Sequence, residues 1–334
     1  MPETMLGAND PVGVLLLNMG GPAAPGEIRP FLTRLFSDPR MLPVPAALRA
    51  PLARVIAWRR SPKVAGKYRA IGGGSPVGQE SERQAAALGE QLGPLFLVRT
   101  LFRYSGPGPD EVLAHLRDRG VRRLVALPAY PQWSGTTSGS SVDHLARSAE
   151  RLGMTWREVP SYPDGEAFID ALCAGVRPLL HGAEHLLLTA HGLPRRVVEA
   201  GDPYAEQVQR TKAALERRLC ADMPCSLAFQ SRLGPVAWIG PHLDDEIRRL
   251  AADGIRRLVV APVSFACENL ETLWDLDREM ARLAAACGIE SYRRAPAPGC
   301  HPRFITQLAG LVREQAVRSG WMPARKIHGV GHVA

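Results

Sequence analysis

The sequence contains one stretch twice: Tyr104-Ser-Gly-Pro-Gly-Pro-Asp-Glu, which runs on to Gly120-Val-Arg-Arg-Leu-Val-Ala-Leu-Pro128, and Trp238-Ile-Gly-Pro-His-Leu-Asp-Asp, which runs on to Gly254-Ile-Arg-Arg-Leu-Val-Val-Ala-Pro262. The two copies align without a gap, and each joins a predicted helix to a short run rich in valine and leucine. A weaker similarity pairs residues 15–22 with residues 186–194. A period this long excludes a solenoid and indicates two structurally similar lobes.

Short apolar runs alternate with longer amphipathic stretches along the chain. Strands are expected at Gly13–Asn18, Leu95–Arg103, Arg123–Ala129, His185–Ala190, Ser226–Gln230 and Arg257–Val263. Helices are expected at Glu80–Gln91, Asp110–Arg119, Tyr204–Arg218 and Asp244–Ala252, among others. The strands lack polar alternation, which is typical of parallel sheets covered on both faces. We therefore predict an α/β fold with two parallel sheets, each flanked by helices.

The two lobes divide the chain near its middle. We predict an N-terminal lobe over residues 10–165, which includes the lip of the active site, and a C-terminal lobe over residues 166–303. A final helix over residues 304–320 is expected to pack back on the N-terminal lobe. Ligands of open parallel sheets bind at the carboxyl ends of the strands, so we expect the active-site cleft between the lobes.

Composition limits the class of protein. The 334 residues are 46% hydrophobic and 22% charged, which suits two well-packed lobes. No apolar run is long enough to span a bilayer and no secretory signal is apparent, so we expect a cytoplasmic protein. The six cysteines are scattered without zinc spacing. The net charge of +8 favours an acidic partner, but the dispersed arginines argue against a nucleic-acid-binding arm.

Polar residues at the expected strand ends are candidates for chemistry. His191 ends a strand and is followed by glycine, a position that suits either a general base or a structural histidine. Glu268, Glu271 and Asp275 are spaced three and four apart, which predicts one acidic helix face. Such a face either carries protons and cations or is simply solvated. The glycine-rich segments lack the GK[ST], GxGxxG and GxSxG signatures of nucleotide sites and serine hydrolases.

Seven motifs occur in an order that resembles the ferrochelatase family. They are Leu17-Asn-Met-Gly-Gly-Pro22, Ile71-Gly-Gly-Gly-Ser-Pro76, Tyr130-Pro-Gln-Trp-Ser134, Ala190-His-Gly-Leu-Pro194, Gly201-Asp-Pro-Tyr204, Gln230-Ser-Arg-Leu-Gly-Pro235 and Leu270-Glu-Thr-Leu273. The resemblance extends from about Val12 to about Val312. It implies two Rossmann-like lobes, each with a four-stranded sheet, and a cleft for a porphyrin between them.

The resemblance also implies an activity and a set of site residues. It implies an enzyme that inserts Fe²⁺ into protoporphyrin IX to give protohaem, the last step of haem synthesis, with porphyrin and Fe²⁺ as its partners. His191 and Glu271 are the implied catalytic residues and metal ligands, and we add Glu268 and Asp275 as a conduit for protons or metal. The implied porphyrin-binding residues are Met19, Arg103, Tyr104, Tyr130, Ser134, Thr136 and Trp238.

Three departures from the family pattern bear on metal chemistry. Asn269 stands where many members carry a histidine, which puts a histidine relay at that position in doubt. Gly135 stands where some members carry a cysteine that binds an iron–sulfur cluster, and no cysteine follows Cys300. We therefore expect no [2Fe–2S] cluster and no tightly bound cofactor.

Other functions stay open from the sequence. Within the same architecture they are a coproporphyrin ferrochelatase and a cobalt or nickel tetrapyrrole chelatase. A non-catalytic porphyrin or haem carrier is a further alternative, although His191 and Glu271 argue against it. Residues 31–58 mix apolar and basic side chains, which predicts either a peripheral contact with the inner face of the membrane or a helix packed on its own lobe. No feature of the sequence predicts the oligomeric state.

Overall fold

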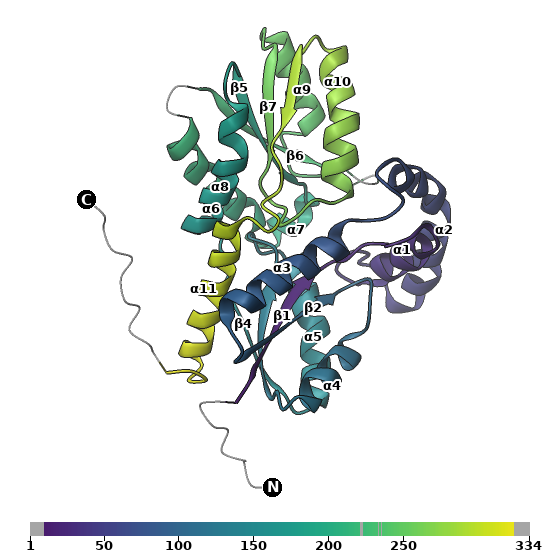
Figure 1. The fold of residues 1–334 in the computed structure, drawn as a ribbon. Helices are drawn as coiled ribbons and strands as arrows, with labels where there is room; N and C mark the ends of the chain where they lie inside the picture. Colours follow the sequence, from purple (N-terminus) through teal and green to yellow (C-terminus); the bar gives the residue numbers. More distant parts are fainter. Residues whose placement is uncertain (1–9, 221–222, 233, 235, 324–334) are drawn as a thin grey trace, which may run out of the picture.

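The computed structural model describes residues 10–220, 223–232, 234 and 236–323, which form two stacked lobes (Figure 1). The first lobe holds a sheet of strands in the order β2-β1-β3-β4 and the second a sheet in the order β6-β5-β7-β8, and both are parallel throughout. The strands are β1 (Val12–Asn18), β2 (Phe96–Phe102), β3 (Arg123–Pro128), β4 (Thr155–Glu158), β5 (His185–His191), β6 (Cys225–Gln230), β7 (Arg257–Pro262) and β8 (Ser291–Arg294). The equivalent strand order confirms the predicted fold of two similar lobes.

The sequence repeat corresponds to one helix and one strand in each lobe. These are α4 (Pro109–Asp118) with β3, and α9 (Leu243–Ala252) with β7, whose bounds fall on aligned positions of the repeat. Gly120 and Gly254 follow the two helices with φ of 84° and 92°. In the first copy the amide of Gly120 bonds to Arg117 and that of Val121 to Leu116. This is a Schellman ending, in which glycine takes the left-handed conformation that other residues disfavour.

Helices cover both faces of each sheet, as the uninterrupted burial of β1 requires. Around the first sheet lie α3 (Val77–Leu92) on one face and α4 with α5 (Ser140–Arg151) on the other. Around the second lie α6 (Glu166–Val176) and α8 (Tyr204–Leu219) on one face, and α9 with α10 (Ala281–Ala286) on the other. The remaining elements are η1 (Pro25–Glu27), η2 (Gly135–Gly139), η3 (Arg177–Leu179), α7 (Arg195–Glu199) and η4 (Glu271–Met280).

One continuous hydrophobic core joins the two lobes. The last helix, α11 (Pro302–Arg318), leaves the second lobe and packs against α3, β3 and α6 (Figure 1). Its Phe304 ring lies 5.9 Å from the ring of Phe168 on α6, which in turn makes an edge contact with Tyr162. Side chains of both sheets belong to this same core. The lobes are therefore held together by buried apolar contacts, which stabilise by about 25 cal/mol per Å² removed from water.

The predicted strands all form, and two further strands complete the sheets. These are the edge strands β4 and β8, of four residues each, whose side chains are at least partly exposed to solvent. Their sequences, Thr-Trp-Arg-Glu and Ser-Tyr-Arg-Arg, lack the apolar run that identifies a strand buried on both faces. The edge position explains why they were not individually predicted.

A helical lip extends from the first lobe beside the second. It consists of α1 (Ile28–Ser37) and α2 (Ala46–Ala70), whose inner faces pack on each other around Leu32, Phe36 and Ala57. Leu270 from the second lobe packs against the same group. In the part of the chain that the structure describes, no helix is long and apolar enough to cross a membrane.

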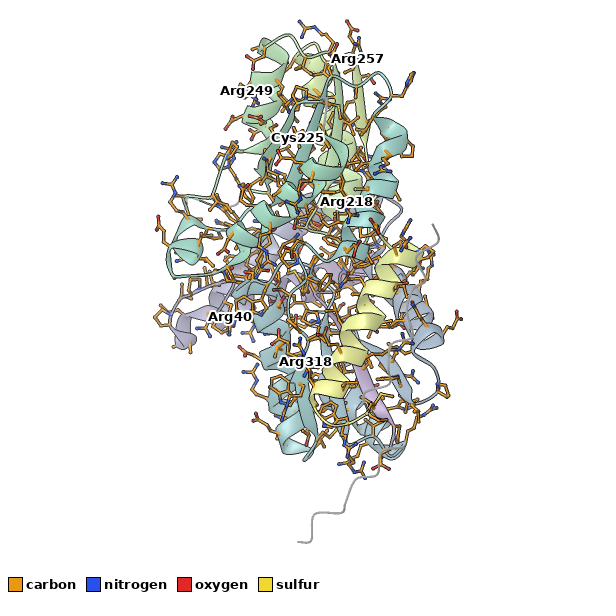
Figure 2. All side chains as sticks on the ribbon, turned by 90° about the vertical axis from the view of Figure 1, so that its left-hand side faces the viewer. Arg40, Arg218, Cys225, Arg249, Arg257 and Arg318 are labelled. Carbon is orange, nitrogen blue, oxygen red and sulfur yellow. The ribbon has the colours of Figure 1, made fainter. Side chains whose placement is uncertain are left out.

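Surface arginines are spread over the molecule and paired with carboxylates. Figure 2 shows the labelled arginines distributed over both lobes. Their partners give the pairs Arg40–Asp143, Arg218–Asp170, Arg249–Glu246, Arg257–Glu184 and Arg318–Glu314. Exposed pairs of this kind stabilise a fold by at most about 1 kcal/mol each. Their main effect is to neutralise much of the basic surface locally.

Candidate active site

His191 is the last residue of β5, at the carboxyl edge of the second sheet. Its backbone N–H donates to Ser264 Oγ at 3.1 Å, and Ser264 follows the neighbouring strand β7. The next amide, that of Gly192, donates to the carbonyl of Gln230 at the end of β6 at 2.8 Å. Hydrogen bonds at the ends of β5, β6 and β7 thus fix the backbone that carries the imidazole.

The imidazole of His191 has a defined tautomer. Its Nδ1 lies 2.7 Å from the carbonyl oxygen of Gly192. Because a carbonyl oxygen only accepts hydrogen bonds, Nδ1 carries the proton and the lone pair is on Nε2. The ring of Trp238 packs nearby, with centroids 6.4 Å apart. A Cβ at position 192 would lie 3.3 Å from this indole and 2.9 Å from the Gln230 carbonyl, so glycine is required for the close approach.

Acidic side chains follow from the same edge of the sheet on η4, which is a π-helix. Glu271, Asp275 and Glu279 are each four residues apart on this helix. A π-helix closes i→i+5 bonds and has more residues per turn than an α-helix, so positions four apart stay on one side of it. Glu279 was not predicted from the sequence, although the same spacing of four continues to it.

The placement of Glu268 corrects the predicted acidic face. Glu268 precedes η4 and is not part of that helix, although its carboxylate accepts a hydrogen bond from the hydroxyl of Thr272. Its carboxylate instead pairs with Arg294 at 2.7 Å and accepts the amide of Ala297 at 2.9 Å. The prediction of one acidic face assumed a regular α-helix from residue 266, whereas the helical segment starts only at Leu270. The carboxylate of Glu268 therefore ties the start of η4 to the segment after β8.

Asn269 caps this helix. Its Oδ1 accepts the amide of Thr272 at 2.9 Å, and its own amide donates to Thr272 Oγ1 at 3.0 Å. This reciprocal arrangement is a capping box, which satisfies amides that a helix start leaves without partners.

Residues from the lip face the acidic series. Lys67 Nζ lies 2.8 Å from Asp275 Oδ1 and 3.2 Å from Glu279 Oε2. Burial raises the pKa of Asp275 to about 6, although the ammonium of Lys67 favours its ionised form. Burial opposes the charge on Lys67, but the two carboxylates outweigh it and hold its pKa above the usual value. Tyr68, whose pKa is raised by burial and then by the charge of Glu271, stays protonated.

Four of the predicted porphyrin residues occupy one region of the first lobe. Arg103 Nη2 pairs with the buried Asp38 at 2.7 Å, and the hydroxyl of Tyr104 donates to the same carboxylate oxygen at 2.8 Å. Tyr130 is partly buried, its pKa is raised by this burial, and it lies close to Tyr104 and to the backbone of Met19. Tyr104 is only 1% exposed, so its ring is packed inside the first lobe and is not open to solvent.

The two remaining predicted contacts, Ser134 and Thr136, have another environment. Ser134 Oγ donates to Asp202 Oδ2 at 2.9 Å and lies 2.9 Å from Thr136 Oγ1. The amide of Gly135 also donates to Asp202 at 2.8 Å. These bonds connect the first lobe to the second through the Gly-Asp-Pro-Tyr motif. These bonds do not involve His191 or Glu271. The predicted site residues therefore form two groups: one at the edges of the sheets, and Ser134 with Thr136 at this contact between the lobes.

A family model described as ferrochelatase matches residues 11–316. The chain belongs to the ferrochelatase family. A protein named ferrochelatase from Cyanothece sp. is 41% identical over 317 residues, which cover 91% of this chain and 82% of the relative. Proteins of the same name from Desulfotalea psychrophila and Phenylobacterium zucineum are 39% and 40% identical over 93% of this chain and 99% and 93% of their own.

Solved structures support the fold of this family member. The chain resembles SirB from Bacillus subtilis with Fe³⁺, with a TM-score of 0.59 and 12% identity over 93% of this chain and 98% of that one. It also resembles CbiX, described as the terminal enzyme for biosynthesis of sirohaem in denitrifying bacteria. That match has a TM-score of 0.50 and 17% identity over 91% of this chain and 98% of the other. At these identities the likeness concerns the fold alone.

Two features of this ferrochelatase-family site had not been predicted from the sequence. Gln230 pairs in register with His191 and is 5% exposed, yet neither atom of its side-chain amide has a hydrogen-bond partner. The buried hydroxyl oxygen of Tyr130, near Ser141 and the backbone of Met19, also forms no hydrogen bond of ordinary geometry. Unpaired buried polar groups are costly, so these atoms are available to a ligand or water. Within the described residues no three His, Cys, Asp or Glu side chains are grouped to hold a metal ion on their own.

Proposed function

We propose that this protein inserts Fe²⁺ into protoporphyrin IX and releases protohaem. The observation that carries the proposal is the lone pair of His191 Nε2 at the carboxyl edge of a sheet, with Glu271, Asp275 and Glu279 on the helix that follows the adjacent strand. The names of the relatives, which are 39–41% identical, agree with this activity. The reaction requires proton acceptors and oxygen or nitrogen ligands, and both are present in this arrangement.

The chemistry of metal insertion has a defined balance. Protoporphyrin IX loses two pyrrole protons, its four nitrogens bind Fe²⁺, and the metal sheds its water. His191 Nε2 and the carboxylate of Glu271 are the groups proposed to take these protons and to contact the arriving metal, since imidazole and carboxylate can do either. Trp238, and Met19 across the lobes, supply apolar contact for a flat macrocycle. Such walls can hold the ring bent, so that the nitrogen lone pairs turn toward the metal.

The acidic series of η4 is proposed to carry protons or Fe²⁺ between Glu271 and solvent. Burial raises the pKa of Asp275 to about 6, so its carboxyl can both accept and release a proton near neutral pH. Lys67 pairs with Asp275 and Glu279 and offsets part of the repulsion among the carboxylates. Glu268 has no part in this proposal, because Arg294 already neutralises it.

Replacement of Lys67 by methionine should shift the acid limb of the pH–rate profile upward. The ammonium favours the ionised form of Asp275, so its removal raises a pKa that is about 6 in the wild-type protein. The measurement is kcat/KM for metal insertion between roughly pH 5 and 9, where a bell-shaped profile reports the essential groups of the free enzyme.

Lys63→Met is the matched control, because Lys63 is exposed and lies one turn earlier on α2. It should leave the profile unchanged. An unchanged acid limb in Lys67→Met would show that Asp275 does not limit the rate, and would remove it from the proposed conduit.

We also propose that the lip docks on the inner face of the cytoplasmic membrane, which places the protein in the cytoplasm as a peripheral protein. The outer face of α2 exposes Leu48 (59%), Leu52 (38%), Val55 (49%) and Trp58 (60%), whose spacing is that of one helix stripe. Arg54, Arg59 and Lys63 are exposed on the same helix. Apolar side chains bordered by basic ones suit a surface of anionic lipid.

Flotation with vesicles should test this docking. We expect binding to vesicles of phosphatidylcholine with phosphatidylglycerol, and roughly tenfold weaker binding of Trp58→Ser, because burying one large apolar side chain contributes about 1.5–3 kcal/mol. Leu95→Ser, which changes an exposed leucine outside the lip, should bind as the wild type does. An absence of binding even to anionic vesicles, or equal losses in both variants, would refute the proposal.

Substrate choice separates this function from its alternatives within the family. Rates should be compared for protoporphyrin IX and coproporphyrin III with Fe²⁺, and for Co²⁺ and Ni²⁺ in place of Fe²⁺. The proposal expects the highest kcat/KM for Fe²⁺ with protoporphyrin IX. A clear preference for coproporphyrin III would replace the proposed substrate, while insertion of Co²⁺ or Ni²⁺ without Fe²⁺ would replace the proposed metal.

A further inference from the structure

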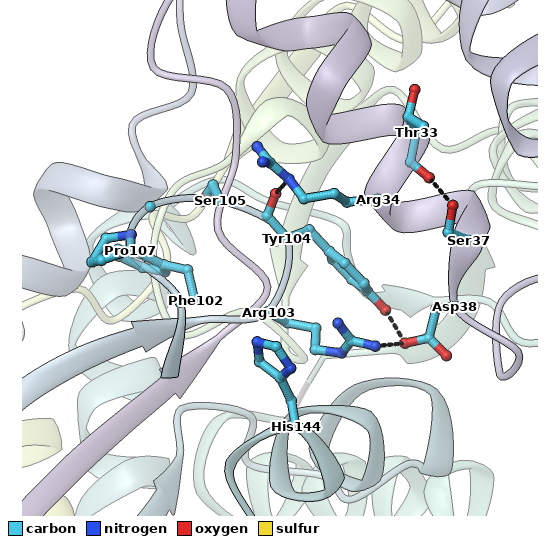
Figure 3. Close-up of a pocket in the computed structure, with 12 residues that line it drawn as sticks. Thr33, Arg34, Ser37, Asp38, Phe102, Arg103, Tyr104, Ser105, Pro107 and His144 are labelled. Carbon is cyan, nitrogen blue, oxygen red and sulfur yellow. Dashed lines mark hydrogen bonds and ion pairs between the residues drawn. The ribbon is translucent and has the colours of Figure 1, made fainter. Parts of the chain in front are cut away.

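A cavity of about 480 Å³ opens on the first lobe between α1, α5 and the loop of residues 105–108 (Figure 3). Arg103 and Tyr104 are the two lining residues that are also predicted porphyrin contacts. Its lining does not include Met19, Tyr130, His191, Trp238, Glu271 or Asp275. The cavity therefore shares two residues with the predicted porphyrin contacts but contains none of the residues proposed to take protons or metal, and its occupant requires its own explanation.

The single carboxylate that lines the cavity is already saturated. Asp38 accepts from Arg103 and Tyr104 and from the hydroxyl of Ser140, and its other oxygen accepts the amide of Arg40 at 2.8 Å. Burial opposes the charge, but these donors outweigh it and hold the pKa of Asp38 below its usual value. Asp38 is thus ionised and neutralises Arg103, which leaves the other cation of the lining without a counter-charge.

That cation is Arg34 on α1. Its Nε donates to the carbonyl oxygen of Tyr104 at 2.7 Å, which fixes the plane of the guanidinium. In Figure 3 its two Nη nitrogens point away from this carbonyl. Among the described residues no carboxylate forms an ion pair with Arg34, in contrast to Arg103. A guanidinium held in this way presents two parallel donors, the geometry that carboxylate and phosphate oxygens fit best.

The rest of the lining adds a neutral imidazole and an apolar wall. His144 on α5 has its pKa lowered to about 4, first by burial and then by the charges of Arg103 and Arg147. At this pKa the imidazole is neutral near pH 7 and adds no charge to the lining. The side chains of Phe102 and Pro107 line the cavity beside the charged groups (Figure 3). The volume lies within the range of pockets that hold small organic ligands.

We infer that this cavity binds a small organic oxyanion, a carboxylate or phosphate ester, whose oxygens accept from the Nη donors of Arg34 while its apolar part lies against Phe102 and Pro107. The inference stands apart from the proposed metal insertion, since it depends on none of the residues that carry that reaction.

Calorimetric titration with phenyl phosphate and benzoate tests the inference directly. Both should bind with a Kd of about 1 mM or tighter, and inorganic phosphate should bind more weakly because it lacks the apolar part. Benzyl alcohol, which lacks the charge, should not bind. Arg34→Gln should weaken the binding of phenyl phosphate at least tenfold. Arg34→Lys keeps the charge but lacks the two parallel donors, and it should lose less affinity. Arg29→Gln removes an exposed arginine from the same helix and is the matched control.

Two further readouts locate the ligand. The backbone amide signals of Gly106 and Gly108, which line the cavity, should shift on titration. Binding should persist when the protein is saturated with protoporphyrin IX. The inference is wrong if neither oxyanion binds, if Arg29→Gln loses as much affinity as Arg34→Gln, or if the porphyrin abolishes oxyanion binding. None of these results would alter the rate of metal insertion, so failure here is distinguishable from failure of the proposed function.

Discussion

Replacement of His191 by alanine should lower the rate of metal insertion by about 100-fold or more while protoporphyrin IX still binds. The variant loses the only ring nitrogen that the structure orients with a free lone pair at this strand end. A positioned acid–base group contributes roughly 10²–10⁴-fold to a rate. The porphyrin keeps its apolar contacts with residues such as Trp238. The measurement is kcat by anaerobic absorbance, with porphyrin affinity measured in parallel by fluorescence quenching.

The control for this variant is His115→Ala, because His115 is exposed on α4 in the first lobe. It should retain the wild-type rate and affinity. A His191→Ala protein that turned over at near the wild-type rate would show that His191 is a structural residue held by the Gly192 carbonyl. Loss of porphyrin binding in His191→Ala would instead assign it to substrate binding.

Replacement of Glu271 by glutamine should also lower kcat by roughly 100-fold, because the amide is similar in size but neither accepts a proton nor carries charge. It starts η4, and its charge is felt by Tyr68 across the lip and by Asp275 one turn on. We expect the thermal unfolding temperature to stay close to that of the wild type. A stopped-flow measurement of insertion at saturating porphyrin and Fe²⁺ separates this loss from weaker binding.

Glu90→Gln provides the comparison, since Glu90 is exposed on α3 and remote from η4. If Glu271→Gln retained more than half of the wild-type rate, the acidic series would serve only to hold the lip through Lys67. The proposal would then lose the second of its two catalytic groups.

Most of the fold could be predicted from the sequence because the two copies of the repeat align without a gap. Each copy contains a helix, a glycine that must adopt positive φ, and a strand buried on both faces, and these local signals agree with one another. The edge strands β4 and β8 carry no such signal, since their apolar positions are few and half exposed. The predicted likeness of the two lobes reappears in the order of the strands.

The site could be predicted only in part. His191 and the acids near Glu271 follow strands, so sequence order alone places them at the sheet edge. The sequence does not show that the helix starts only at Leu270, which is why Glu268 was grouped with Glu271 and Asp275, while Glu279 was missed although it continues the spacing of four. Lys67 was missed for a different reason: it reaches Asp275 from a helix far away in the chain, and only the packing of the lip brings them together.

The most direct test of the proposed activity is anaerobic mixing of the purified protein with Fe²⁺ and protoporphyrin IX. The account predicts that the absorption bands of the free porphyrin convert catalytically to those of protohaem, with two protons released for each iron inserted. A porphyrin spectrum that stays unchanged while the porphyrin remains bound would contradict it, and would show that this member of the family carries the ring without metallating it.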